Sequence, residues 1–170
     1  MAETPTGDAP EQQNPPLVIN GQYIKDLSFE APNAPAVFGA LQKGQPDVNI
    51  GVDVNARPLQ DNLFEVELHV RAQCKAEDSV AFIAELVYAG LFSLNVPDEH
   101  REPVLLVECP RMLFPFARSI LADVTRDGGF PPLMLSMIDF VAMYQRNKQE
   151  AAAKAEGGDA AADMVTEGEA

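Results

Sequence analysis

One stretch of the chain decides the fold class: LFEVELHVRAQCKA, residues 63–76. Apolar and polar residues alternate along it without a break, which is the pattern of a β-strand with one buried and one exposed face. The side chains expected to face the core are Phe64, Val66, Leu68, Val70, Ala72 and Cys74. Those expected to face outward are Glu65, Glu67, His69, Arg71 and Gln73. The stretch therefore predicts a sheet with one apolar and one polar face.

Two earlier stretches predict further strands of this sheet. VNIGVDVNA, residues 48–56, alternates Val48, Ile50, Val52 and Val54 with polar or small residues. YIKDLSFE, residues 23–30, is expected to place Tyr23, Leu27 and Phe29 on one face and Asp26, Ser28 and Glu30 on the other. Pro32 and Pro35 then end that strand, because proline has no N–H for the ladder, and a short helical turn around Val37 and Phe38 is expected to follow.

A fourth strand is predicted in VAFIAELVYAGLFSL, residues 80–94. Periodicity alone does not separate strand from helix in so apolar a run, but its β-branched and aromatic content, Gly90 and the preceding turn residues favour a strand. A strand here places Ile83 and Glu85 on one face.

Helical spacing begins only after these strands. Leu113, Phe116, Ala117, Ile120, Leu121 and Val124 recur along one side of a predicted helix that ends at Gly128 and Gly129. A second helix is predicted from Asp139, a plausible N-cap, with Phe140, Met143 and Tyr144 on one side. Strands followed by helices indicate an α+β fold with an antiparallel sheet. The connection GGFPPLMLSM, residues 128–137, is apolar for a loop, so the core, a subunit interface or a binding partner must cover it.

Composition places a single domain between two tails. The chain has 170 residues, 46% of them hydrophobic, which suffices for one core. Residues 1–17 are rich in Pro, Gln and acid and are expected to be disordered, and residues 18–147 are expected to form the domain. Residues 148–170 are expected to continue a helix briefly through their alanines and then to form a disordered acidic tail. A net charge of −14 argues against nucleic acid and favours basic or unfolded polypeptide partners.

The sequence predicts a soluble, cytoplasmic protein that does not insert into membranes. The N-terminus has no basic start and no apolar run, so we expect no secretory signal. The longest apolar run, 80–96, contains Glu85, Ser93 and Asn95 and is shorter than the ~20 residues that span a bilayer. Cys74 and Cys109 are too few for a disulfide framework and lack the spacing of a zinc site, so a reducing compartment fits and no metal or cofactor is expected.

Enzyme chemistry finds no support in the sequence. It contains no nucleophile motif, P-loop or dinucleotide fingerprint. His69 lies among Glu67 and Arg71 on a polar strand face, and a solvated surface explains it better than a catalytic pair. Asp26 and Glu30 are about 13 Å apart along a strand, beyond the ~9.5 Å that a glycosidase pair allows. We expect a binding protein.

Three stretches resemble the SecB family of bacterial protein-export chaperones: YIKDLSFEAPNAPAVF (23–38), AFIAELVYAGLFSL (81–94) and ECPRMLFPFARSILADVTRDGGFPPLML (108–135). The resemblance covers residues 18–146, and the combination of FEAPNAP, LFPFAR and GGFPPL is specific. It implies a four-stranded antiparallel sheet with a long and then a shorter helix, assembled as a homotetramer that is a dimer of dimers. It also implies an ATP-independent chaperone that holds newly made precursor proteins unfolded and delivers them to the SecA motor of the Sec translocase.

The resemblance also implies roles for individual residues. The outer-face residues that would dock the basic, zinc-bearing C-terminal region of SecA are Asp26, Glu30, Ile83 and Glu85, with the zinc held by SecA. The residues of the substrate groove would be Phe130, Leu133, Met134, Phe140, Met143 and Tyr144. The tetramer interface would involve Phe116, Ile120, Leu121, Val124, Leu86 and Tyr88. Leu86 to Ala89 are more apolar than is usual in the family, which leaves the strength of assembly open, and a SecB-like chaperone for other clients, such as a toxin–antitoxin pair, is the alternative.

Overall fold

The computed structural model describes residues 15–162, and its side chains to residue 155. Most of the N-terminal tail expected at 1–17 and the last part of the tail expected at 148–170 lie outside the described residues. Pro15 and Pro16 are held in place, because both of their carbonyls accept hydrogen bonds from Asn95.

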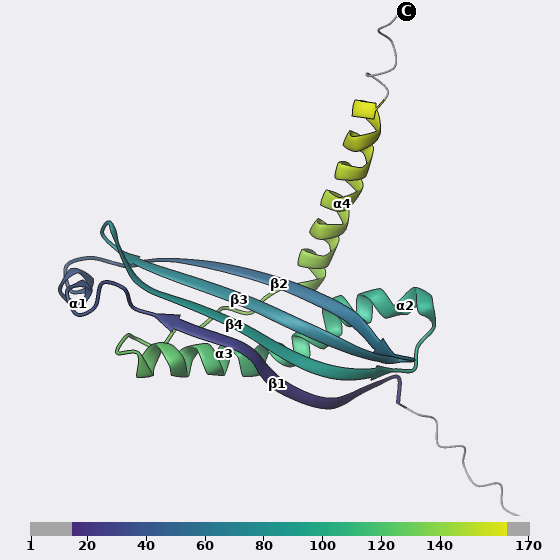
Figure 1. Cartoon of the computed structure of the whole chain (residues 1–170), viewed down its shortest axis with the longest axis horizontal. Coiled ribbons are helices and arrows are strands. Elements are labelled where there is room, and N and C mark those ends of the chain that lie inside the picture. The colour runs from purple at the N-terminus through teal and green to yellow at the C-terminus, as the bar shows by residue number, and fades with distance from the viewer. Residues whose placement is uncertain (1–14, 163–170) are drawn as a thin grey trace, which may run out of the picture.

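Four long antiparallel strands form one sheet (Figure 1), as the alternating patterns predict. They are β1 (Leu17–Glu30), β2 (Asp47–Gln60), β3 (Leu63–Ala76) and β4 (Ser79–Leu94). Their order in the sheet is β1-β4-β3-β2, so β1 and β2 are the edges. The strand between residues 80 and 94, which periodicity alone left open, is the central partner of β1 and β3.

The two faces of the sheet differ as the alternation predicts. The inner face, which the helices cover, carries the buried side chains of β3 and β4, including Leu68, Val70, Leu86 and Phe92. The outer face carries Glu65, Glu67, His69 and Arg71 of β3, and Figure 1 shows no helix on it. The inner face is therefore buried and apolar, and the outer face is exposed and charged.

The first helical segment is longer than the sequence predicts. α2 (Asp98–Pro103), η1 (Val104–Glu108) and α3 (Cys109–Asp127) follow one another without a break, so helix begins well before Leu113, where the predicted helical spacing starts. Asp98 and Glu99 lie in the first turn, where acidic side chains are stabilised by the helix dipole. The turn at η1 is a π-helical turn, which is wider than an α-helical turn, and in it the Cys109 N–H donates to the carbonyl of Val104. The wider turn leaves room for the ring of Pro110 beside the preceding carbonyls.

α3 packs closely against the middle of β4. Gly90 makes this possible, because a Cβ at that position would lie 2.6 Å from the ring of Phe92 and 2.9 Å from Leu113 of α3. The helix ends at Asp127, and Gly129, which has a φ of +89°, turns the chain in the left-handed region that glycine tolerates best. The expectation that Gly128 and Gly129 end this helix is confirmed.

The expected short turn after the first strand is α1 (Val37–Leu41). The last helix is α4 (Phe140–Ala162), and the Asp139 carboxylate accepts the Ala142 N–H at 3.0 Å, as an N-cap does. α4 runs past residue 148 as far as Ala162, so helix continues through the alanine-rich stretch into the segment expected to be a tail. Figure 1 shows α4 pointing away from the body.

Candidate functional site: an acidic sheet face and an apolar trough

The pairing of β1 with β4 gathers the four residues expected to dock SecA into one patch. Glu30 lies opposite Ile83, Ser28 opposite Glu85 and Asp26 opposite Val87. Directly paired residues of an antiparallel sheet share a face, and their diagonal neighbours are about 7–8 Å apart. Glu85 is therefore a diagonal neighbour of both Asp26 and Glu30. We call Asp26, Glu30, Ile83 and Glu85 the acidic patch.

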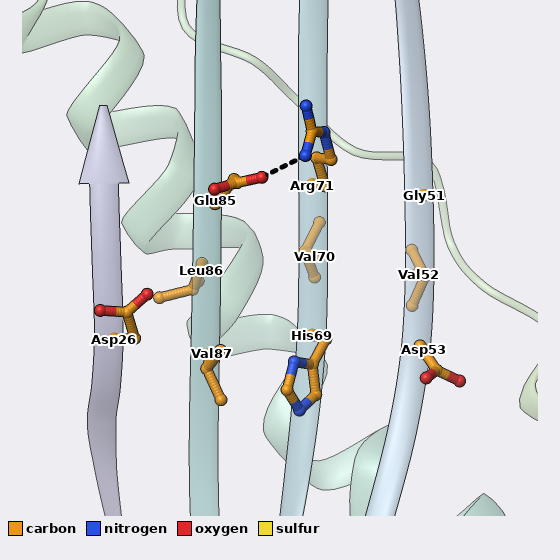
Figure 2. Close-up of a pocket in the computed structure, with 10 residues that line it drawn as sticks. All are labelled: Asp26, Gly51, Val52, Asp53, His69, Val70, Arg71, Glu85, Leu86 and Val87. Carbon is orange, nitrogen blue, oxygen red and sulfur yellow. Dashed lines mark hydrogen bonds and ion pairs between the residues drawn. The ribbon is translucent and has the colours of Figure 1, made fainter. Parts of the chain in front are cut away.

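Within the described residues, Asp26 and Glu30 have no ion pair and no side-chain hydrogen bond, although both are exposed. Glu85 is paired: its carboxylate accepts a hydrogen bond from Arg71 at 2.5 Å. This pair lines a hollow of about 430 Å³ on the outer face. Figure 2 shows the pair between Asp26 of β1 on one side and Gly51 and Asp53 of β2 on the other. The patch thus offers two free carboxylates and one that a cation already neutralises.

A β-bulge makes the faces of β1 differ from those that the sequence predicts. The pairing shifts between Ile24 and Asp26, so Lys25 is an extra residue and the alternation changes phase there. Tyr23 consequently faces outward, and its hydroxyl bonds to Glu65, whereas it was expected to share the inner face with Leu27 and Phe29. Sequence alternation does not reveal the bulge, because an inserted residue leaves no compositional mark.

The bulge builds a cluster on the outer face that the sequence analysis missed. Glu65 accepts hydrogen bonds from Tyr23, from Lys25 at 3.0 Å and from Arg57 at 2.5 Å. Lys25 also bonds to Glu67, which His69 contacts at 2.9 Å. We call Tyr23, Lys25, Arg57, Glu65 and Glu67 the Glu65 cluster. It neutralises its own carboxylates, so the unpaired acids of the described outer face include Asp26 and Glu30 of the acidic patch and Asp53 of β2, but not Glu65 or Glu67.

Glu65 is only 3% exposed although it lies on the outer face. Burial by itself raises the pKa of a carboxyl, but the hydrogen bonds from Arg57, Tyr23 and Lys25 outweigh it and lower the pKa of Glu65 to about 2. Glu65 therefore stays ionised at neutral pH and holds β1 to β3 across β4. The only sequence signal for this role was a glutamate among other polar residues.

On the inner face, the loop between α3 and α4 forms one wall of an apolar hollow. Phe130, Leu133 and Met134, three of the residues expected in the substrate groove, line it together with Leu41, Pro46, Val48, Cys74 and Phe82. Phe130 is buried in an aromatic cluster with Phe29, Phe38 and Phe82. Met134 is 60% exposed at the rim. The buried aromatic rings around Phe130 thus fix the position of this wall, and the flexible side chain of Met134 is exposed to solvent at its rim.

A second hollow lies beside the middle of β2. Met143 and Tyr144 of α4, also expected in the groove, line it with Val54, Glu102 and Leu106. Val48 and Val54 belong to the same face of β2, about 20 Å apart at ~3.3 Å per residue, and Ile50 between them is 43% exposed. We call this partly exposed face of β2, with the two hollows beside it, the trough. The sequence placed these valines on a core face and gave no sign that the helices leave them uncovered.

Some residues expected at binding surfaces are interior. Phe140 is almost fully buried against Phe114 and lines neither hollow, so it belongs to the core rather than to an exposed binding surface. Leu86 and Leu121 are fully buried in the core of this chain, so neither can contact another copy. Leu86 lies on the inner face of the sheet and Leu121 on the side of α3 that packs in the core. Ile120 and Val124 are half-buried on α3.

Phe116 and Tyr88 stack on each other, with ring centroids 6.1 Å apart, at the edge of an apolar surface that the sequence analysis missed in part. Phe116 is 50% exposed, and Ile24, paired with Tyr88, is 47% exposed. The surface, which we call the β1 surface, consists of Ile19, Ile24 and Leu27 of β1 with Met112 and Phe116 of α3. The bulge is why Ile24 faces inward.

Within residues 15–162, no cluster of His, Cys, Asp or Glu could hold a metal ion, and no helix there is long and apolar enough to cross a bilayer. Cys74 and Cys109 are both buried and unpaired, and burial raises the pKa of the Cys109 thiol to about 12.

Comparison with known proteins identifies a close similarity. The family model described as "Preprotein translocase subunit SecB" matches residues 10–151. The curated "Protein-export protein SecB" of Rhodospirillum rubrum is 56% identical over 153 residues, covering 90% of this chain and 95% of that protein. That of Granulibacter bethesdensis is 52% identical, covering 85% and 90%.

Among solved structures, the SecB-like chaperone of Mycobacterium tuberculosis, in complex with a peptide of the HigA1 antitoxin, matches with a TM-score of 0.56 at 19% identity. The match covers 72% of this chain and 91% of that one. At this identity the similarity supports the α+β fold.

Proposed function

This chain belongs to the SecB family of protein-export chaperones, and from that premise we propose that it holds unfolded preproteins in the trough and delivers them by docking SecA on the acidic patch. The family is one of chaperones rather than enzymes. The proposal also places the protein in the cytoplasm, and it requires neither nucleotide nor cofactor.

The trough supports the binding of unfolded chain. An unfolded segment exposes apolar side chains that a folded client hides, and an uncovered face of β2 about 20 Å long gives them a place to bury apolar surface. Met134 at the rim adapts its shape, as suits a site for many sequences. A binder of the unfolded state lowers the folded fraction by mass action, so no energy source is needed.

The names of the relatives favour export clients over the alternative. The relatives above 50% identity are named protein-export proteins, whereas the SecB-like chaperone bound to an antitoxin peptide is 19% identical. We therefore propose preproteins as the clients and do not favour a toxin–antitoxin pair.

The observation that carries SecA docking is the pair of free carboxylates on a sheet face that no helix covers. Asp26 and Glu30 have no cation partner in the described part of the chain, while the Glu65 cluster next to them is internally neutralised. A face with unpaired acid attracts a basic partner and steers its approach. The basic, zinc-bearing C-terminal region of SecA is the proposed partner.

The β1 edge supports a proposal of assembly. As an edge strand it leaves a row of backbone N–H and C=O groups unpaired, and the apolar β1 surface adjoins it. Isolated subunits rarely leave both features open. We propose that further copies of the chain cover them in a homotetramer.

The docking proposal is tested by titrating the full protein with a peptide spanning the SecA C-terminal zinc region, with zinc bound, at low and moderate salt. Binding to the wild type should weaken with salt, because exposed charges are screened over ~8 Å at physiological ionic strength. Glu30→Lys should abolish it.

Asp61→Lys is the matched control for this titration. It makes the same charge change in the β2–β3 turn, about 30 Å along the sheet from the acidic patch. An equal loss of binding in both variants would mean that net charge alone causes the effect, and it would contradict the acidic patch as the docking site.

The holding activity is tested by the refolding rate of a signal-bearing precursor, with no nucleotide added. The wild type should slow refolding. Val48→Glu, which puts a charge in the trough, should slow it less, and refolding at the same rate with and without the wild type would contradict the proposal.

A further inference from the structure

A cation, Arg71, lies beside the acidic patch and pairs with one of its carboxylates. Arg71 of β3 lies directly opposite Glu85 of β4, and its guanidinium donates to the Glu85 carboxylate at 2.5 Å (Figure 2). Both side chains are exposed, at 61% for Arg71 and 43% for Glu85. An exposed pair of this kind exchanges partners readily, because its net stabilisation is small.

Arg71 differs from the other cations of the outer face. Lys25 and Arg57 belong to the Glu65 cluster, where both bind the Glu65 carboxylate, which is 3% exposed, and Lys25 also binds Glu67. Arg71 instead binds the one acid that stands diagonal to both Asp26 and Glu30. Its removal would leave three free carboxylates in the acidic patch in place of two.

We propose that Arg71 is an internal competitor for the basic partner of the acidic patch: it occupies Glu85 in the free protein and must release it before the partner can pair with all three carboxylates. The inference rests on the proposed docking function. It assigns to Arg71 the role of setting the affinity and salt dependence of docking, so that release of the partner is favoured by the return of Arg71 to Glu85.

The structure gives the displaced guanidinium room to move. On the side away from Glu85, Arg71 is paired with Gly51, which has no side chain, and a Cβ there would meet no atom within 4 Å. The hollow of about 430 Å³ opens at this point. Arg71 can therefore swing toward β2 without displacing another side chain.

The test compares Arg71→Gln with Arg126→Gln in the same SecA peptide titration. Arg126 is an exposed arginine of α3, paired with Asp123, so its variant makes the same change of net charge away from the outer face. Arg71→Gln should bind the peptide about two- to five-fold more tightly than Arg126→Gln at low salt, the range that one exposed ion pair supports. Equal affinities would overturn the inference.

A double-mutant cycle locates the competition at Glu85. Glu85→Gln should weaken binding little in the wild type, where Arg71 already neutralises the carboxylate, and at least two-fold more strongly in the Arg71→Gln background. Identical losses in the two backgrounds would show that Arg71 and Glu85 act independently and would overturn the inference. These outcomes are distinct from failure of the docking proposal, in which the wild type and every variant leave the peptide unbound.

Discussion

At the scale of single residues, Gly90 shows how a missing side chain sets the packing of the fold. The ring of Phe92 and the side chain of Leu113 occupy the space that a Cβ would need. α3 can therefore lie close to β4, the central strand that carries Ile83 and Glu85 on its other face.

Gly90→Ala should lower the free energy of unfolding by about 1–3 kcal/mol, the usual effect of overpacking. Gly51→Ala is the matched control, since it lies in β2 with open space around the added methyl group, and it should leave stability unchanged or slightly higher. Urea unfolding of both variants measures this. A Gly90→Ala variant as stable as Gly51→Ala would show that α3 shifts freely.

Glu65 is the second residue whose role depends on its surroundings. Its pKa is lowered in the folded protein to about 2 from the ordinary value of 4.5. The stabilisation from a depressed pKa is present above the unfolded value and is lost as the pH falls through the folded value. Glu65 therefore contributes fully above about pH 5 and progressively less toward pH 2, with an upper bound on the order of 3 kcal/mol.

Glu65→Gln should accordingly be less stable than the wild type at pH 7, and the difference between the two should shrink as the pH falls from 5 toward 2. Unfolding by urea at a series of pH values gives the comparison. A difference independent of pH would mean that Glu65 acts through packing rather than through its charge.

At the scale of elements, the loop between α3 and α4 is held by a buried hydroxyl. Thr125, which is fully buried at the end of α3, donates to the carbonyl of Leu121 at 2.8 Å and accepts the Leu133 N–H at 2.9 Å. Together with the aromatic cluster around Phe130, this bond fixes the wall of the trough.

Thr125→Val should cost about 1–2 kcal/mol of stability, because the shape is kept while the Leu133 N–H loses its acceptor. The amide of Leu133 should exchange its hydrogen faster than in the wild type. Thr125→Ser, which keeps the hydroxyl, should retain the slow exchange of this amide. Fast exchange in both variants would assign the effect to the lost methyl group.

At the scale of the whole molecule, the β1 surface is the feature that supports the proposed assembly of several copies. Ile24 and Phe116 are each about half exposed, on neighbouring elements and next to an unpaired strand edge. Burying the exposed half of each such side chain is worth about 1 kcal/mol, which favours association of copies through this surface.

Ile24→Glu with Phe116→Glu should shift the protein to a smaller species in analytical ultracentrifugation. Met137→Glu is the control, since Met137 is 78% exposed in the loop and outside the β1 surface. An unchanged molar mass for the double variant would place the interface elsewhere.

The sequence by itself determined the four strands, the division of the sheet into an apolar and an acidic face, the N-cap at Asp139 and the family. These depend on local periodicity and on short motifs, which a single chain displays directly. It could also place Asp26 with Glu30, and Ile83 with Glu85, because each pair lies within one strand.

Only the tertiary structure decided how those pairs meet, since the register of β1 on β4 depends on two bulges that leave no trace in composition. The same holds for the outward position of Tyr23, the burial of Glu65 and the pairing of Arg71 with Glu85. The uncovered face of β2 and the interior position of Leu86 and Leu121 likewise depend on where the helices lie. Each of these is a contact between residues distant in sequence, and its energy comes from burial and charge that only the folded chain brings together.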